Sequence, residues 1–375
     1  MNFYAAGGAV RDLILGRALR DVDYVFDDAD GLFIQRNPSA RKIKGMEPPL
    51  YLLDGQELCP LGAEPRDLTQ NILARDFTVN ALLLDERGVI RAHPLTFADL
   101  QAGLIRPVSD GALLHSPVRA LRAARFNATL PGFAPHEDCL RLMRELPDQA
   151  LAGIAAEQAG RESLKACLGA KPGNYLRCLE KGRCLAVWFA EFARAAHIPA
   201  GPPPWHDSSL LEHTARVMDD CARNDAPERL APQERQTAVW MALCHDIGKN
   251  ATPRELLPKH HGHDKRGEAM AEALGLRLRL PKAMVRAGAM AARLHMKAAR
   301  YMELRPGSKA DLLISLDRAG LCAPFFRLVA ADSGRDDLPP LMRRDLERIL
   351  ALRLPRHKQG LGPASGAFLR QLRCA

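Results

Sequence analysis

The sequence contains no uncharged apolar run that approaches the ~20 residues needed to span a bilayer, although the chain has 375 residues. It also has no CxxC pair, and its nine cysteines are odd in number. The first eight residues, MNFYAAGG, lack the basic start and apolar core of a secretory signal peptide. These absences argue against a membrane protein, a disulfide scaffold and a zinc ribbon. We therefore expect a cytoplasmic protein with reduced thiols.

The composition is that of an ordinary folded protein, with 47% hydrophobic and 26% charged residues. A chain of this length commonly forms two to four domains. The net charge of +9 suits a polyanionic partner such as nucleic acid, or else a merely soluble basic surface. Positions 341–375 hold eight Lys/Arg against two Asp/Glu, which favours the polyanion. Nothing in the sequence sets an oligomeric state.

Residues 1–100 alternate between strand-like and helix-like patterns, which predicts an α/β or α+β unit. From Ser116 onward, strand signals nearly vanish and apolar residues take helical spacing. We expect an all-α remainder there. The predicted strands are 3–6, 22–26, 50–53 and 79–84, and the first predicted helix is 9–15.

Residues 7 to 23 combine three features that suit a nucleotide phosphate and a metal ion. Gly7 and Gly8 lie between a predicted strand and helix, so backbone N–H groups can approach a phosphate closely. Arg11, in the first turns of that helix, can pair with the same phosphate. Asp21 and Asp23 are two apart on a predicted strand, which places both carboxylates on one face. Such a pair can hold the Mg²⁺ ions of an in-line phosphoryl displacement.

A predicted helix that begins at Ser116-Pro117 carries three arginines on roughly one face. Ser is a favoured N-cap and Pro a favoured first residue, and Arg119, Arg122 and Arg125 follow at intervals of three. Guanidinium groups pair with phosphates or with base edges. Taken alone, the pattern fits equally well a solvated basic stripe or internal salt bridges.

Histidines gather in the second half of the chain, where seven of the twelve lie between positions 206 and 295. His245 and Asp246 are adjacent on an apolar predicted helix, where a buried carboxylate needs a partner. Neutral imidazoles and carboxylates suit a divalent ion such as Ni²⁺, Mn²⁺ or Mg²⁺. A single histidine here is more simply a core residue, but the ordered set predicts a metal site. Its predicted ligands are His213, His245, Asp246, His263, His295 and Asp332.

Four ordered motifs resemble one known family. GGAVRD at 7–12 and DVDYVF at 21–26 are similar to the signature of the class II tRNA nucleotidyltransferase and poly(A) polymerase family. RDFTVNAL at 75–82 and PVRALRAARF at 117–126 resemble its next two motifs. In addition, CHDIGK at 244–249 resembles the signature of HD phosphohydrolases. The resemblance covers nearly the whole chain and is greatest to bacterial CCA-adding enzymes that carry a C-terminal HD domain.

The resemblance implies a fold of the α+β class: a small α/β nucleotidyltransferase head, then an all-α neck, body and HD domain. We expect the head at 1–104, the neck and body at 105–200, the HD domain at 205–335 and a basic helical tail at 336–375. The proline-rich stretch 199–204 is the expected boundary before the HD domain.

The resemblance also implies an activity. C, C and A would be added in turn to tRNA 3′ ends from CTP and ATP, with Mg²⁺ held by Asp21 and Asp23. The body and basic tail would bind tRNA, and the HD domain would hydrolyse 2′,3′-cyclic phosphodiesters and phosphate esters. Arg125 would be structural. The predicted nucleotide contacts are Gly8, Arg11, Arg75, Arg119 and Arg122.

The head departs from the family pattern at the position that selects the base. The family has a Glu-Asp-x-x-Arg template, whose Asp and Arg hydrogen-bond the incoming base, whereas this chain has His115 and Ser116 before Arg119. The stretch between Asp23 and Arg75 is also short, so a long flexible loop that the family links to the switch from C to A is missing. Base selection is therefore open.

Alternative functions remain at this stage. The chain could be a CC-adding specialist that leaves the final A to a partner enzyme. It could be a poly(A) polymerase, against which the HD domain argues, or an HD phosphohydrolase with a decayed head. Met296 follows His295 where the family commonly has Asp, which leaves the activity of the HD site open. Glu57 is a candidate third carboxylate of the head.

Overall fold

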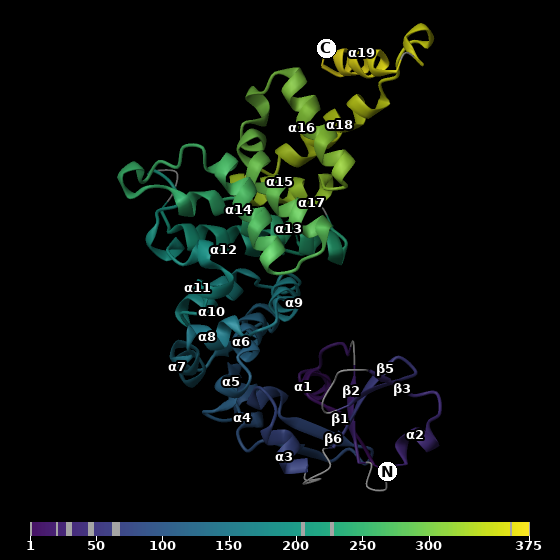
Figure 1. Cartoon of the computed structure of the whole chain (residues 1–375), viewed down its shortest axis with the longest axis vertical. Helices are drawn as coiled ribbons and strands as arrows, with labels where there is room; N and C mark the ends of the chain where they lie inside the picture. Colours follow the sequence, from purple (N-terminus) through teal and green to yellow (C-terminus); the bar gives the residue numbers. More distant parts are fainter. Residues whose placement is uncertain are drawn as a thin grey trace. The chain divides into compact units, whose positions relative to one another are not determined.

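The computed structural model confirms the predicted α+β class: a mixed sheet near the N-terminus is followed by helices (Figure 1). The chain forms two compact units, Met1–Ala123 with Gly132–Ala150 and Ala124–Pro131 with Leu151–Ala375. The structure describes residues 2–19, 22–27, 32–43, 49–61, 68–203, 207–225, 229–360 and 362–374.

The first unit is built on a seven-stranded sheet in the order β3-β4-β5-β2-β1-β6-β7. β2 and β5 run parallel, and the other neighbouring strands are antiparallel. The predicted strands at 3–6, 22–26 and 50–53 correspond to β1, β2 and β4. The strands are β1 Phe3–Ala6, β2 Asp23–Phe26, β3 Arg41–Ile43, β4 Leu50–Leu53, β5 Gln56–Pro60, β6 Leu82–Asp85 and β7 Ile90–Ala92.

The strand predicted over 79–84 is wrong in its first half, because Thr78–Asn80 forms a 3-10 turn and β6 begins at Leu82. The Thr78 N–H donates to the carbonyl of Arg106 (2.9 Å) and its hydroxyl donates to Asp99 (2.7 Å), so Thr78 is held away from the ladder. β3, β5 and β7 were not predicted, since β3 and β7 have only three residues each and β5 begins with the exposed Gln56 and Glu57. A two-stranded pair, β8 Leu104–Ile105 and β9 Ala134–Pro135, also interrupts the region expected to be all helical.

An aromatic cluster fixes the strand that carries Asp23. Phe26 of β2 stacks on Phe33 of α2, with ring centroids 4.1 Å apart, and both are buried with Leu58 of β5. Burial of a Phe or Leu side chain stabilises a fold by ~1.5–3 kcal/mol. The packing therefore holds β2 beside β5. The helices that belong wholly or in part to this unit are α1 Gly8–Ile14, α2 Phe33–Arg36, α3 Leu68–Leu73, α4 Thr96–Ala102, α5 Ala112–His115, α6 Val118–Thr129, α7 Glu137–Glu145 and α8 Asp148–Ala152.

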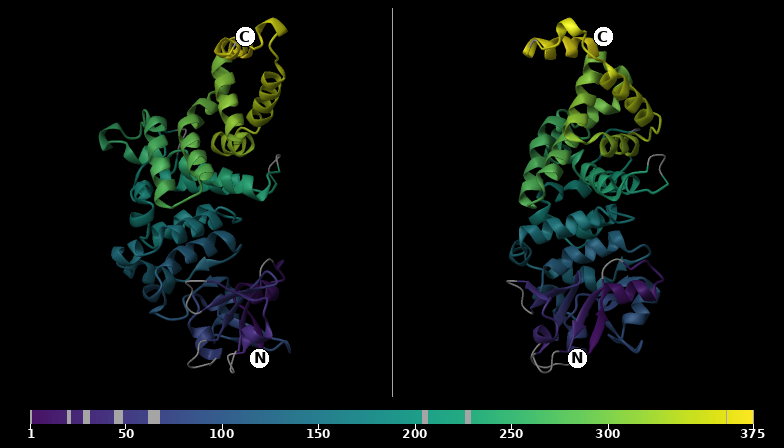
Figure 2. Two further views of the ribbon diagram at one scale, coloured as in Figure 1. Left: turned by 45° about the vertical axis from the view of Figure 1, so that its right-hand side comes forward. Right: turned by 90° about the vertical axis from the view of Figure 1, so that its right-hand side faces the viewer.

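The second unit consists of helices and connecting segments in its described part (Figure 2). Its larger helices are α9 Ala156–Ala166, α10 Gly173–Lys181, α12 Leu210–Cys221, α13 Pro232–Cys244, α14 His263–Arg277, α15 Lys282–Ala299, α16 Pro306–Ala319, α17 Cys322–Ser333, α18 Leu338–Ala351 and α19 Pro363–Cys374. The short helical segments are α11 Leu185–Trp188, η2 Ala190–Phe192, η3 Ala195–His197, η4 Ile247–Ala251, η5 Arg254–Leu256, η6 Tyr301–Glu303 and η7 Arg356–Lys358.

The stretch expected as a domain boundary is bonded to the helices that follow it. Pro199 pairs with Ser209 in an isolated bridge. The carbonyl of Pro199 lies 2.9 Å from Nε2 of His260, and the carbonyl of Ala200 accepts from Nζ of Lys249 at 2.8 Å. The described part of the basic tail contains α18, η7 and α19, joined by segments without helix, and Arg370 of α19 forms an ion pair with Asp311 of α16 (2.7 Å).

Candidate active sites

Two arginine side chains lie against the glycine turn that follows β1. Gly7 has φ +64°, a backbone conformation that favours glycine, and a Cβ added to it would lie 2.9 Å from Nη1 of Arg75. A Cβ on Gly8 would lie 3.4 Å from Nη2 of Arg11. The two glycines therefore leave room for two guanidinium groups, which approach the turn from separate motifs.

Arg11 is only 6% exposed and is held from two sides. It donates to Oδ1 of Asn80 at 2.6 Å and forms an ion pair with Asp12 at 2.9 Å. Arg75 donates to Oδ1 of Asn71 at 3.0 Å. The positions of both side chains are thus set by hydrogen bonds within the unit.

Asp76 connects several residues of this site, and the sequence analysis gave it no role. Its carboxylate pairs with Arg122 at 2.8 Å, accepts from the N–H of Phe77 at 2.8 Å and accepts from Nδ2 of Asn80 at 3.1 Å. Since Asn80 also binds Arg11, one buried carboxylate links arginines from two motifs. The available signal was that Asp76 lies inside the RDFTVNAL motif.

Arg119 lies close to the same group. Its guanidinium donates to the carbonyls of Ala74 (2.6 Å) and Ala112 (3.2 Å). Burial lowers the pKa of Arg119, Asp76 acts in the opposite direction, and the neighbouring Arg122 lowers it further. The structure therefore brings together all five residues predicted to bind the nucleotide.

The carboxylates expected to bind metal are partly described. Asp21 lies outside the described residues, and Asp23 is the exposed first residue of β2. Burial lowers the pKa of Arg75, while the charges of Asp76 and Asp23 raise it, so Asp23 acts on the same group of side chains. Glu57 precedes Leu58 of β5, which pairs in parallel with Tyr24 of β2, so the backbone of Glu57 runs beside that of Asp23.

Ser116, at the position that selects the base in the family, and Arg125, the third arginine of the predicted helix, have other contacts than the residues described above. Ser116 ends α5, and its carbonyl accepts from the N–H of Arg119 (2.9 Å) as α6 begins. Among the described residues, the Ser116 hydroxyl has no hydrogen-bond partner. Arg125 instead pairs with Glu162 (2.5 Å) in the second unit, with its guanidinium 3.9 Å from the ring centroid of Phe126. That is a structural environment for Arg125.

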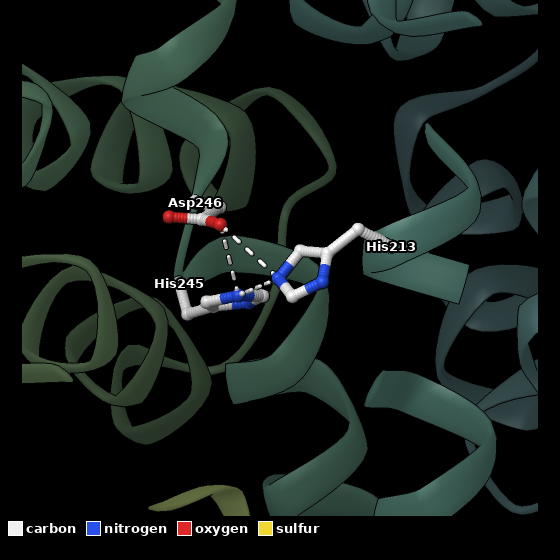
Figure 3. Close-up of side chains that lie close together, drawn as sticks. All are labelled: His213, His245 and Asp246. Carbon is white, nitrogen blue, oxygen red and sulfur yellow. Dashed lines mark hydrogen bonds and ion pairs between the residues drawn. The ribbon is translucent and has the colours of Figure 1, made fainter. Parts of the chain in front are cut away.

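The second candidate site is a buried cluster of imidazoles and carboxylates. Nε2 of His213 lies 3.2 Å from Nε2 of His245, and each of the two atoms lies 3.3 Å from Oδ2 of Asp246 (Figure 3). Asp332 completes this set, with its Oδ1 3.3 Å from His213 and 3.4 Å from His245. His213 lies on α12 and Asp332 on α17, while His245 and Asp246 follow the end of α13.

The other oxygen of Asp246 faces a second pair of histidines. Nε2 of His263 and Nε2 of His295 are 3.1 Å apart, and they lie 3.2 and 3.3 Å from Oδ1 of Asp246. Asp246 is 2% exposed, and its Oδ2 also pairs with Nζ of Lys249 at 2.7 Å. One carboxylate is thereby shared between two pairs of imidazoles.

Hydrogen bonds to the backbone set which ring nitrogens face inward with a lone pair. Nδ1 lies 2.6 Å from the carbonyl of Ala242 in His245, 2.7 Å from that of His260 in His263 and 2.9 Å from that of Ala292 in His295. A neutral imidazole that donates from Nδ1 has its lone pair on Nε2. The clustered nitrogen and oxygen atoms then present lone pairs to one another. Such a set needs a proton or a metal ion among its members.

The electrostatics of the cluster favour a cation. Burial alone would lower the pKa of His245, but Asp246 and Asp332 raise it to about 10. Burial works to raise the pKa of Asp246, yet Lys249 and His245 hold it well below its ordinary value. The two carboxylates therefore stay ionised and attract positive charge.

The structure distinguishes among neighbouring histidines. His263 faces the cluster, whereas His260 bonds the hydroxyl of Thr252 (2.9 Å) and the carbonyl of Pro199, and His261 is exposed. Met296 follows His295 on α15, about 100° further round the helix. His295 reaches the cluster with Met296 beside it, so the departure at position 296 does not prevent the six predicted residues from meeting.

Comparison with known proteins identifies the domain that carries most of the second cluster and the family of the whole chain. Residues 210–319 match the model of the HD domain. The chain is 32% identical over 368 residues to the multifunctional CCA protein of Thioalkalivibrio sulfidiphilus, covering 90% of this chain and 87% of the relative. It is 30% identical over 413 residues to that of Halorhodospira halophila, covering 100% of this chain and 96% of the relative.

Solved structures share the fold. The Thermotoga maritima CCA-adding enzyme complexed with tRNA has a TM-score of 0.65 at 16% identity, covering 100% of this chain and 86% of that one. The Bacillus stearothermophilus CCA-adding enzyme in complex with CTP has a TM-score of 0.63 at 21% identity, covering 99% and 87%. Among the described residues, no helix is both long and apolar enough to cross a membrane. With the sequence identity and coverage of its relatives, the chain belongs to the family of multifunctional CCA proteins.

Proposed function

We propose that this chain adds C, C and A to the 3′ end of tRNA, using CTP and ATP, in the cytoplasm. The observation that carries the proposal is the convergence of Arg11 and Arg75 on the glycine turn, beside the strand that begins at Asp23. A triphosphate needs several positive charges close to a backbone without side chains, and this turn offers them.

The side chains present fit a magnesium site at the start of β2. Asp23 is exposed and lies near enough to Arg75 to affect its pKa, which burial lowers and Asp76 and Asp23 raise. Carboxylate and phosphate oxygens are the ligands that Mg²⁺ takes. We assign Asp21 and Asp23 to the ion, with Glu57 as a third candidate. Bound there, Mg²⁺ would favour ionisation of the tRNA 3′-hydroxyl and neutralise charge on the α-phosphate.

The residues of the chain position the reactants. The 3′-hydroxyl oxygen forms a bond to the α-phosphorus, the bond from that phosphorus to the bridging oxygen breaks, and pyrophosphate leaves with the electron pair. The hydroxyl proton passes to solvent. Arg11 and Arg75 hold the departing phosphates, and Asp76 fixes Arg122 toward the nucleotide. Catalysis then rests on orientation and charge neutralisation.

A second reading, addition of CC only, is favoured by one residue. Ser116 stands where the family has the base-reading Asp, and it offers no charge to the exocyclic amine of C or A. The short stretch between Asp23 and Arg75 points the same way. We nevertheless propose full CCA addition, because the relatives are named multifunctional CCA proteins.

Labelled nucleotide incorporation separates the candidate functions. With tRNA lacking CCA, we expect one product three nucleotides longer. A product two nucleotides longer indicates the CC specialist, a ladder indicates a poly(A) polymerase, and no product indicates an HD hydrolase with a decayed head. In the decisive arm, tRNA ending in CC is given ATP alone, and efficient addition of one A excludes the CC specialist.

We further propose that the HD cluster holds divalent metal and hydrolyses 2′,3′-cyclic phosphodiesters and phosphate esters. The inward lone pairs and ionised carboxylates support this, with donor separations of 3.1 to 3.4 Å that bonds of ~2.0–2.2 Å to a shared ion can span. We assign one ion to His213, His245, Asp246 and Asp332, and a second to Asp246, His263 and His295. Ni²⁺, Mn²⁺ or Mg²⁺ bound there would activate water for attack on phosphorus.

A matched pair of variants tests the HD assignment. His245→Ala removes a ligand, and His261→Ala removes an exposed histidine. We expect the first to abolish metal-dependent hydrolysis of 2′,3′-cyclic AMP and the second to leave it intact, with nucleotide addition preserved in both. Hydrolysis that persists in His245→Ala would contradict the assignment, as would a wild-type protein inactive with all three metals.

A further inference from the structure

Helix α15 presents a continuous line of positive charge on its exposed side. Lys282, Arg286, Arg293, Lys297 and the helix-ending Arg300 are all exposed. At about 100° per residue, they lie within roughly 60° of one another around the helix axis. With a rise of ~1.5 Å per residue, the line is about 27 Å long. We call these five residues the α15 stripe.

The charge of the α15 stripe is largely uncompensated. Helix α15 itself contains no Asp or Glu. Arg293 pairs with Glu268 of α14 at 2.9 Å. Among the described residues, no carboxylate lies within ion-pair distance of the other four members. Structural salt bridges therefore do not explain why the stripe is basic.

A cavity lies beside the first part of the stripe. Its volume is about 610 Å³, and Lys282, Arg286 and Arg293 line it together with Arg318 and with apolar side chains such as Leu276 and Met290. Two carboxylates, of Glu268 and Glu272, also line it. Its lining has a positive net charge, and it gives an extended anion a place to lie against the helix.

The α15 stripe is distinct from the metal cluster. His295 lies about 200° round the helix from Arg293, so the ligand is on the inner face and the stripe on the outer one. At its far end the stripe approaches the basic tail: Arg370 of α19 lowers the pKa of Asp311 through an ion pair, and Lys297 adds to that effect. The line of charge thus continues toward α19.

The chemistry of the stripe suits one class of partner. A helix that binds membranes exposes large apolar residues beside its basic ones, whereas Met284, Val285 and Met290 of α15 are at most 8% exposed. Leu276 of α14, which also lines the cavity, is 60% exposed, but it lies off the line of charge. An array of cations along ~27 Å whose neighbouring apolar side chains on α15 are buried matches a backbone of repeated phosphates. We propose that the α15 stripe is an RNA-binding surface of the HD domain, which contacts the phosphates of the tRNA substrate. The choice of tRNA rests on the proposed function.

Two triple variants with equal loss of charge test the proposal. The stripe variant combines Lys282→Gln, Arg286→Gln and Lys297→Gln. The control combines Arg254→Gln, Lys259→Gln and Lys265→Gln, which are exposed positions of the same domain. Dissociation constants for tRNA are measured from 50 to 300 mM salt. Hydrolysis of 2′,3′-cyclic AMP, a small substrate, checks that both variants are folded.

We expect the stripe variant to bind tRNA about tenfold more weakly at low salt. The slope of log K against log salt should fall by about one for each contact removed, and the control should match the wild type. Equal affinities of the two variants, whether both are unchanged or both are weakened, would overturn the proposal. A wild-type protein that neither binds tRNA nor extends it would instead overturn the proposed function, which keeps the two failures apart.

Discussion

The two candidate sites differ in the charged groups that they bring together. In the first unit, Arg11 and Arg75 lie against a glycine turn, and a single buried carboxylate, Asp76, pairs with Arg122 and reaches Arg11 through Asn80. In the second unit, Asp246 and Asp332 lie among four imidazoles. The first site gathers cations that the chain itself carries, as the proposed binding of a triphosphate requires. The second gathers two carboxylates, Lys249 and four imidazoles, of which His245 holds a proton in the metal-free cluster, so a bound metal ion would replace a proton there.

The sites also differ in exposure. Asp23 is exposed at a strand start, and the proposed function needs access there for a tRNA end and a nucleotide. His245 is fully buried and Asp246 is 2% exposed, since neutral imidazoles with fixed tautomers are best held by packed helices. Changes in the first site should therefore alter reaction rate, and changes in the second should alter metal content first.

The largest effect is expected from the carboxylates of the first unit. Asp21→Ala or Asp23→Ala removes a proposed metal ligand, and we expect nucleotide addition to fall by about three orders of magnitude or more. Both variants should still bind tRNA and hydrolyse 2′,3′-cyclic AMP, because the sites lie in separate units. Single-turnover incorporation of CTP measures the effect. Full activity in either variant would contradict the assignment.

Asp76→Asn tests whether the first site depends on its ordering carboxylate. The variant keeps the shape of the side chain but loses charge-assisted hydrogen bonds, each worth ~1.5–3 kcal/mol. We expect kcat/KM for CTP to fall by about 10- to 100-fold. Asp99→Asn is the matched control, because Asp99 is equally buried but binds Thr78 and Arg106. Equal losses in both variants would show that the effect is only one of stability.

The prediction of site residues from sequence depended on whether local motifs carried the signal. His245 and Asp246 are adjacent in the sequence, and the structure places them in one cluster with His263, the member of three neighbouring histidines that the sequence analysis favours. The role of Asp76 was missed because it arises from Arg122, which approaches only in the folded unit. The sharing of Asp246 between two pairs of histidines was likewise invisible, since it depends on which oxygen faces which helix.

The secondary structure was likewise predictable only where the local sequence pattern was clear. The strands β1 and β4, which have no exposed residue, were predicted from their apolar residues, while β3 and β7 have only three residues each and gave no pattern. The turn Thr78–Asn80 looked like a strand because Val79 is apolar, but hydrogen bonds to Asp99 and Arg106 decide its backbone. Tertiary bonds override local propensity at these positions.

The pH dependence of metal binding should distinguish the two sites. Burial lowers the pKa of His245, but Asp246 and Asp332 raise it to about 10 in the metal-free cluster, so the imidazole is protonated near pH 7. A metal ion must displace that proton, and affinity therefore rises with pH until about 10. We expect an increase of about tenfold per pH unit for each proton displaced. Calorimetry of Mn²⁺ binding in buffers of different ionisation enthalpy measures the proton release.

Ordinary carboxylates and guanidinium groups keep their charge between pH 7 and 9, so the first site provides the contrast. The KM for CTP should change little over this range in the same preparations. A metal affinity of the HD cluster that is independent of pH would contradict the raised pKa of His245. It would show that the imidazole of His245 is neutral in the metal-free protein.

The smallest effect concerns the choice of base. Ser116→Asp restores a charged acceptor where α5 ends and α6 begins. A carboxylate bonded to an exocyclic amine is worth ~1.5–3 kcal/mol, against ~0.5–1.5 for a neutral partner. The difference corresponds to about tenfold in selectivity. C and A present an amine at that edge, whereas U and G present a carbonyl, so discrimination should improve for CTP over UTP and for ATP over GTP.

Ser116→Asn is the control, because Asn has the size of Asp but no charge. Ratios of kcat/KM on tRNA ending in C and in CC measure both steps. If neither ratio moves in Ser116→Asp, the base is read by other residues, and the unpaired hydroxyl of Ser116 is incidental to selection.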